Sequence, residues 1–198
     1  MSLPYQVMFR GKPACPCLAE WLPVYEAELL RRGAIRESID IYQLIGGAAA
    51  SAGTHSKGGA YDLAQVSPEA ILVARQMGAA AWHRPKNWDH AGGIEHQHGV
   101  LNGCPHNGPA RYQLAALAAG RNGLANNYPD TGPRIMPLPT WRQGIAWAWE
   151  QAKPQRPAGI QATIDAAKKA KDAAAKNPVR RRKLRDILAT LRGMGGKK

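Results

Sequence analysis

The sequence predicts an α+β fold: a small antiparallel sheet with flanking helices, followed by a basic, helical C-terminal extension. Short alternating apolar stretches stand between amphipathic ones, without the regular alternation of a βαβ protein. The 198 residues are 44% hydrophobic and 21% charged, as in globular proteins. The charge is uneven, with 13 basic and 11 acidic residues in 1–152 but 14 and 3 in 153–198. We therefore expect one domain over 1–152 and a basic Ala/Lys/Arg-rich tail over 153–198.

The expected elements of the first domain follow from periodicity and from helix-capping residues. Residues 67–78 fit a helix that Ser67 caps, with Pro68 at its first position. Trp141, Trp147 and Trp149 are interpreted as part of a helix that seals the edge of the core. The remaining predicted helices are 18–32 and 110–119, and the predicted strands are 37–44, the second half of 54–63, 79–84 and 93–101.

The tail is predicted to form two helices, over 158–176 and 179–192, separated by Pro178. Its basic residues suit nucleic acid, an anionic membrane surface or the phosphate-bearing polymers of a cell wall. Alternatively, the tail is a solvated arm that contacts a partner, such as a phage tail protein, through a stripe of leucines. No aromatic residue interleaves the basic ones, so base stacking with nucleic acid is not indicated.

Several classes of protein are not indicated by the sequence. There is no apolar run of about 18 residues, so we expect no transmembrane segment. The N-terminus lacks the basic and apolar regions of a signal peptide. The three cysteines cannot form a disulfide framework.

Histidine and carboxylate residues gather between positions 55 and 98. His55 and Asp62 flank the dipeptide Gly58-Gly59, and Glu95 directly precedes His96 and His98. On a strand His96 and His98 share a face, and Glu95 does not. A sharper turn at the strand end would instead bring Glu95 and His98 together. Imidazole and carboxylate groups are usual zinc ligands, but histidines at such spacings also occur without a metal, in cores and on surfaces.

The run from Ser51 to Leu63 resembles the SxHxxGxAxD motif of the zinc D-Ala-D-Ala carboxypeptidase and L-alanyl-D-glutamate endopeptidase family, which includes phage endolysins. His55, Gly58, Ala60 and Asp62 match in register, and Gly53 replaces the leading serine. The segment 93–100 is similar to the part of the family that supplies the third ligand. The resemblance covers roughly residues 8–150 and is closest to an actinobacterial phage branch.

The resemblance implies zinc as the cofactor, with His55, Asp62 and His98 as its ligands. Glu95 matches the family's general base, and His96 matches an auxiliary histidine; which of the two is the base stays open. Gln43, or less favourably Arg36, would hold the substrate carbonyl. Trp82 and His83 are proposed to contact substrate, although they and His90 could instead be packing residues of a loop.

A second group of residues is Cys15, Cys17, Cys104 and His106. Two short pairs far apart in the sequence suit a structural metal site, although Cys-x-Cys is tighter than the usual spacing. A disulfide from Cys104 to Cys15 or Cys17, or three free thiols, are the alternatives.

The predicted function is that of a zinc metallopeptidase that cuts a stem-peptide or cross-link amide of peptidoglycan. The protein would be phage-encoded and act at the bacterial cell wall, either after holin-dependent release from the host cytoplasm or from a virion tail. The alternative is a tail-tip protein that keeps the peptidase fold with little or no activity. A nucleic-acid-binding role rests on the pI of 10.1 alone and is weakened by the nearly neutral body.

Overall fold

The computed structural model describes residues 2–47, 51–86, 93–153, 165–166 and 168–169. Contacts within the chain divide it into two units, Met1–Ala152 and Lys153–Lys198. In the second unit Asp165, Ala166, Lys168 and Lys169 are helical and exposed, and the rest of the predicted tail helices lies outside the described residues. Within the described ranges, no helix combines the length and the apolar character needed to cross a membrane.

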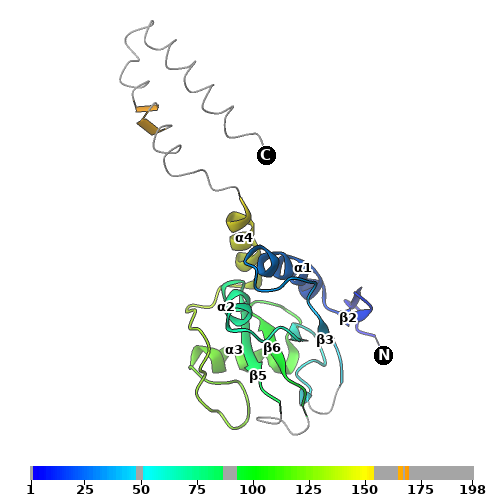
Figure 1. The fold of residues 1–198 in the computed structure, drawn as a ribbon. Helices are drawn as coiled ribbons and strands as arrows, with labels where there is room; N and C mark the ends of the chain where they lie inside the picture. The colour runs from blue at the N-terminus through cyan, green and yellow to red at the C-terminus, as the bar shows by residue number, and fades with distance from the viewer. Residues whose placement is uncertain (1, 48–50, 87–92, 154–164, 167, 170–198) are drawn as a thin grey trace, which may run out of the picture. The chain divides into compact units, whose positions relative to one another are not determined.

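A four-stranded antiparallel sheet forms the centre of the first unit (Figure 1). Its strands, in spatial order, are β3 (Ile41–Gln43), β4 (Ala60–Leu63), β6 (His96–Leu101) and β5 (Ala79–Arg84). The sheet and its flanking helices confirm the α+β class. Directly opposed residues on the central strands include Asp62 and His98, and next to them Trp82 on β5.

Three helices build the larger core on one face of the sheet. They are α1 (Pro16–Arg31), α2 (Pro68–Gln76) and α4 (Trp141–Ala152), and α1 packs against both of the others. Hydrogen bonds join buried polar atoms on this face: Trp21 Nε1 donates to Met77 O at 2.8 Å, and Tyr25 Oη donates to Gln97 Oε1 at 3.1 Å. Because side chains alternate along a strand, Tyr61, Leu63 and Gln97 point into this core.

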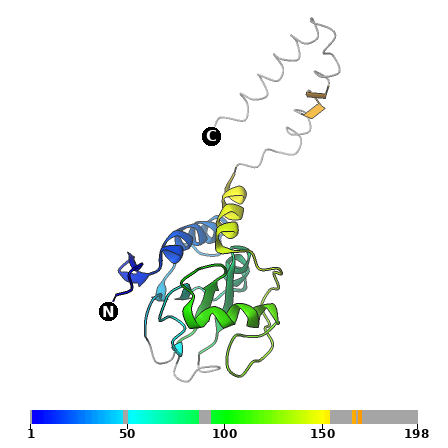
Figure 2. The same ribbon diagram turned by 180° about the vertical axis from the view of Figure 1, so that it is seen from behind.

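Helix α3 (Arg111–Ala118) lies across the opposite face of the sheet, as Figure 2 shows. It is preceded by one 3₁₀ turn, Gly108–Ala110. Ala60 and Val100 pack against Ala110 and Leu114 in a small second core on this face. The alternation that sends Leu63 and Gln97 to the large core therefore sends Asp62 and His98 to the α3 face.

Buried charges reinforce the first unit at two places. Glu28, on α1, accepts hydrogen bonds from Arg31 and Arg32 at 2.7–2.8 Å. Arg75, on α2, forms a bidentate pair with Asp130 and also donates to the carbonyl of Ala81. The Arg75 contacts hold the loop that follows α3 against the sheet.

Several predicted boundaries differ from those of the structure. Helix α1 begins at Pro16, because Cys15 is extended (φ −83°, ψ 156°) and proline suits the first helical turn. The strand predicted over 37–44 is only Ile41–Gln43, where the pairing with β4 shifts register. The strand predicted over 93–101 begins at His96.

The sequence analysis did not predict a hairpin of β1 (Val7–Phe9) and β2 (Lys12–Ala14). Its tight turn uses Arg10 and Gly11, both with positive φ. Proline is uncommon inside strands, and Pro13 lies in the second one.

Candidate metal centre

Side chains of His55, Asp62 and His98 converge on the α3 face of the sheet. Each offers one ligand atom, and these three atoms lie within 4.8 Å of one another. Asp62 on β4 and His98 on β6 are directly opposed partners in the antiparallel ladder, so the backbone pairing alone brings them side by side. His55 comes from the loop between β3 and β4. The three predicted ligands are thus brought together by the fold.

The loop that carries His55 is shaped by glycines. Gly58 and Gly59 have φ of 121° and 74°, which residues with a side chain rarely adopt. A Cβ atom on Gly59 would also lie 1.9 Å from Asn107 Oδ1. The chain can therefore turn between the two ligands only with glycine here.

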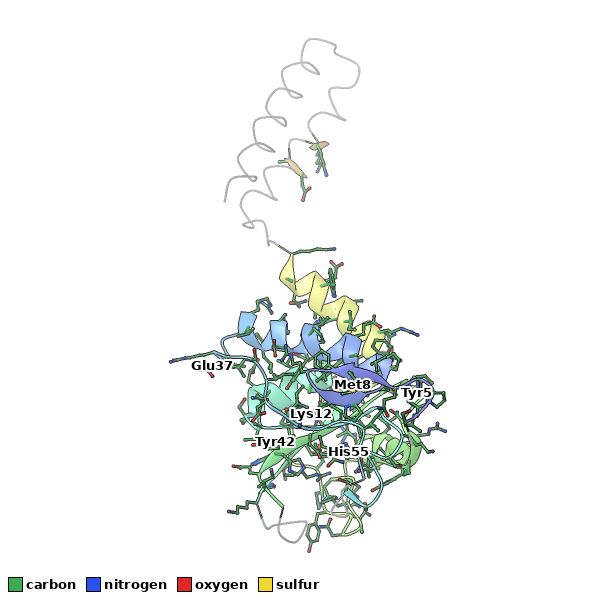
Figure 3. The ribbon with its side chains drawn as sticks, turned by 90° about the vertical axis from the view of Figure 1, so that its right-hand side faces the viewer. Tyr5, Met8, Lys12, Glu37, Tyr42 and His55 are labelled. Carbon is green, nitrogen blue, oxygen red and sulfur yellow. The ribbon has the colours of Figure 1, made fainter. Side chains whose placement is uncertain are left out.

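His55 is fixed in orientation by the backbone directly after β3. Its Nδ1 lies 2.8 Å from the carbonyl oxygen of Leu44, which can only accept, so Nδ1 carries the proton. Nε2 then faces Asp62 Oδ2 at 3.2 Å. His55 is 1% exposed, and Figure 3 shows it inside the body of the unit.

His98 is oriented by Gln113 of α3. Gln113 Nε2 donates to Gly123 O at 3.1 Å, which turns its Oε1 toward His98 Nε2 at 2.9 Å. His98 Nε2 is therefore the donor, and the lone pair of Nδ1 faces Asp62 Oδ1 at 2.8 Å. Hydrogen bonds of this kind, which fix the tautomer of an imidazole, are usual behind metal-binding histidines.

The electrostatics of the three groups fit a bound cation. Burial raises the pKa of Asp62, but its close contacts with His55 and His98 outweigh burial and hold that pKa well below its usual range. Burial lowers the pKa of His98 in spite of its contact with Asp62, which favours neutral imidazole. Neutral nitrogens thus present lone pairs to an ionised carboxylate, an arrangement that a metal ion between them would stabilise.

The site opens into a cavity of about 400 Å³ that reaches solvent. His96 lines it, with Nε2 3.6 Å from Asp62 Oδ1 and Nδ1 2.7 Å from the carbonyl oxygen of Ile94. Gln43 lines it too, and its buried Nε2 has no hydrogen-bond partner among the residues that the structure describes. Both side chains can therefore face a ligand in the cavity.

Glu95 directly precedes β6, and its side chain contacts His83 on the other face of the sheet. Its Oε1 is 2.7 Å from Nε2 of His83, both side chains are exposed, and Glu95 is absent from the described lining of the cavity. Trp82, the neighbour of His83, stacks on the side of His98, with ring centroids 6.4 Å apart. Because successive strand residues alternate, Glu95 and His83 point away from the three converging ligand atoms.

The other residues predicted to contact substrate are absent from the described lining of the cavity. Trp82 is buried beside His98, and its Nε1 donates to Arg121 O at 3.3 Å, so it is a wall residue behind the site. Arg36 is exposed and outside the described cavity lining; Figure 3 shows its neighbour Glu37 projecting away from the body. His90 lies outside the described residues.

Gln113 is a site residue that the sequence analysis did not identify. The only signal available was a polar residue on the buried side of a short predicted helix, and nothing in the sequence paired it with His98. Its role comes from the packing of α3 across the sheet.

A second group that could hold a metal ion consists of Cys15, Cys17, Cys104 and His106. All three cysteines are free, so neither proposed disulfide is present.

Comparison of the chain with protein-family models, with curated proteins and with solved structures found no match.

Proposed function

We propose that residues 1–152 form a zinc-dependent peptidase that hydrolyses an amide bond in the peptides of peptidoglycan. The observation that carries the proposal is the convergence of two imidazoles and one carboxylate at the wall of an open cavity. Nitrogen and oxygen ligands suit zinc, and three protein ligands leave a fourth position for water or substrate, as in catalytic zinc sites. The motif around His55 and Asp62 supplies the substrate class.

His55 Nε2, Asp62 and His98 Nδ1 would hold the zinc ion. Zinc supplies Lewis acidity there, which polarises a carbonyl group and makes water a nucleophile near neutral pH. Asp62 contributes the negative charge of the site, while Leu44 O and Gln113 keep the two imidazoles in the tautomers that ligation requires.

We assign the general base to His96 because it lines the cavity, whereas Glu95 pairs with His83 on the opposite face. The bond between Nδ1 of His96 and the carbonyl of Ile94 places the proton on Nδ1, so Nε2 can accept a proton from water and pass it to the leaving amine. Gln43 Nε2 would donate a hydrogen bond to the substrate carbonyl.

The basic tail, in this proposal, attaches the enzyme to anionic wall polymers. It carries 14 basic and 3 acidic residues, outside the unit that holds the site. Attraction between exposed charges weakens as the Debye length falls from about 8 Å at physiological salt to about 3 Å at 1 M. Deleting residues 158–198 should therefore weaken binding to intact walls, and high salt should have the same effect. A truncated protein that binds walls normally would contradict this role.

The decisive experiment is hydrolysis of purified peptidoglycan by the full chain, with mass spectrometry of the released peptides. Activity should disappear with a chelator, return with zinc, and be absent in His55→Ala. His96→Ala should lose about 100-fold or more, as expected for a missing base, while Glu95→Gln should retain most activity. Metal-loaded wild-type protein that releases no peptide would overturn the proposal and favour the non-catalytic tail-tip alternative. If Glu95→Gln lost activity and His96→Ala retained it, Glu95 would be the general base.

A further inference from the structure

A second cluster of metal-ligating side chains lies where the start of α1 meets the turn after β6. Cys15 and Cys17 flank the first residue of α1, and Cys104 and His106 are in the turn. One ligand atom from each lies within 4.8 Å of the other three. The cysteines are between 0% and 5% exposed.

Three of the distances between these atoms match a tetrahedral site. Zn–S bonds of about 2.3 Å and Zn–N bonds of about 2.0–2.1 Å at tetrahedral angles place two sulfurs about 3.8 Å apart and a sulfur and nitrogen about 3.6 Å apart. Sγ of Cys15 and Sγ of Cys104 are 3.8 Å apart. His106 Nδ1 is 3.7 Å from Sγ of both Cys17 and Cys104.

The local backbone explains how a Cys-x-Cys pair can serve such a site. Cys15 is extended and caps the N-terminus of α1, while Cys17 is already helical, so the two sulfurs can face one point despite their short spacing. A helix N-terminus favours a thiolate. The amide of Gly59 donates to Cys15 Sγ at 3.3 Å, which further stabilises negative charge on that sulfur.

We infer that Cys15, Cys17, Cys104 and His106 bind a structural zinc ion, separate from the site of His55, Asp62 and His98. Four protein ligands complete a tetrahedron and leave no position for substrate, which is the property of structural zinc sites. The ring of Tyr5 covers His106, with centroids 4.0 Å apart, and its hydroxyl donates to Lys57 O.

This ion would join three segments that are far apart in the sequence. Besides α1 and the turn after β6, the loop between His55 and Asp62 rests on the cluster. A Cβ atom on Gly58 would lie 2.9 Å from Cys15 Cβ, and Gly59 is hydrogen-bonded to Cys15 Sγ. The structural ion would therefore also support the loop that carries a ligand of the first site.

The inference is tested by metal content and by cobalt spectroscopy on the full chain. Protein purified without chelator should contain about two zinc ions per chain and His55→Ala about one, since that variant lacks a ligand of the first site only. After exchange of zinc for Co²⁺, wild type and His55→Ala should both show thiolate-to-cobalt charge-transfer absorption, which a His₂Asp site cannot give.

Two variants of the cluster complete the test. Cys104→Ser should lose the charge-transfer band, whereas His106→Cys should keep it because four cysteines also form a closed zinc site. If Cys104→Ser does not fold, the spectra of wild type and His55→Ala decide alone. Wild-type protein without the band, or with all three thiols modified equally fast with and without a chelator, would overturn the inference. These results are independent of peptidase activity.

Discussion

Replacing Gln113 by alanine tests whether the first metal centre depends on helix α3. Gln113 is buried, and its Oε1 accepts a 2.9 Å hydrogen bond from His98 Nε2. The substitution leaves the three ligands intact and removes the acceptor that fixes the tautomer and ring orientation of His98. If the site depended on its three ligands alone, this change would not alter its metal affinity.

The expected magnitude follows from the geometry. Loss of a hydrogen-bond partner behind a ligand typically lowers metal affinity 10–100-fold, which corresponds to about 1.4–2.7 kcal/mol. In metal-free protein the same change leaves the buried N–H of His98 without an acceptor, at a cost of about 1–3 kcal/mol in unfolding free energy. Both effects should appear in the same variant.

Metal affinity is measured by equilibrium competition with a zinc chelator. The zinc that remains bound in His55→Ala is subtracted, so that only the first metal centre is counted. Stability is measured by urea unfolding in excess chelator. Arg111→Ala is the matched control, since Arg111 is exposed on the same helix. Gln113→Ala with the affinity of wild type would refute the reasoning, as would an equal loss in Arg111→Ala.

Three further predictions concern the stability of the first unit, measured by urea or thermal unfolding. Burial raises the pKa of Glu28, but hydrogen bonds from its two arginine partners outweigh burial and lower it. The contribution of Glu28 to the free energy of unfolding should therefore be complete above its unfolded pKa of about 4.3 and be lost as the pH falls through its lower folded pKa. Glu28→Gln should remove this pH dependence and lower the free energy of unfolding by about 1.5–3 kcal/mol at neutral pH. Gly144→Ala should destabilise by about 1–3 kcal/mol because the new Cβ would lie 2.0 Å from a backbone oxygen, whereas Gly47→Ala, with open space around it, should not. Arg75→Met should cost about 3–5 kcal/mol because it leaves Asp130 without its charge partner, and a loss below 1 kcal/mol would contradict the buried pair.

The sequence predicted the parts of the site that depend on local spacing. Strand alternation predicted that His96 and His98 share a face, and in the structure both side chains line the same cavity. Glu95, which the resemblance put forward as the general base, instead lies against His83. The strand predicted over 79–84 has the same bounds as β5. Periodicity sufficed here because strand pairing carries it directly into three dimensions.

Other features depend on contacts that spacing does not encode. The pairing of Gln113 with His98 arises from the position of α3 on the sheet, which no local pattern reveals. The convergence of Cys15 and Cys17 with Cys104 needs the turn after β6 to meet the start of α1, about 90 residues earlier in the chain. The β1–β2 hairpin has strands of only three residues, one of them with Pro13, so it carries little strand signal in the sequence.

The opposition of Asp62 and His98 across β4 and β6 also links the metal centre to cooperative unfolding. The same ladder sends Gln97 into the large core, where its amide meets Tyr25 and Tyr61. A shift of the pairing register by one residue would bring an imidazole into that core and Gln97 to the cavity. The packing on the two faces of the sheet is therefore lost together. Amide protons of the β4–β6 pairing should consequently exchange only through opening of the whole sheet, and the ligands should separate in that same event.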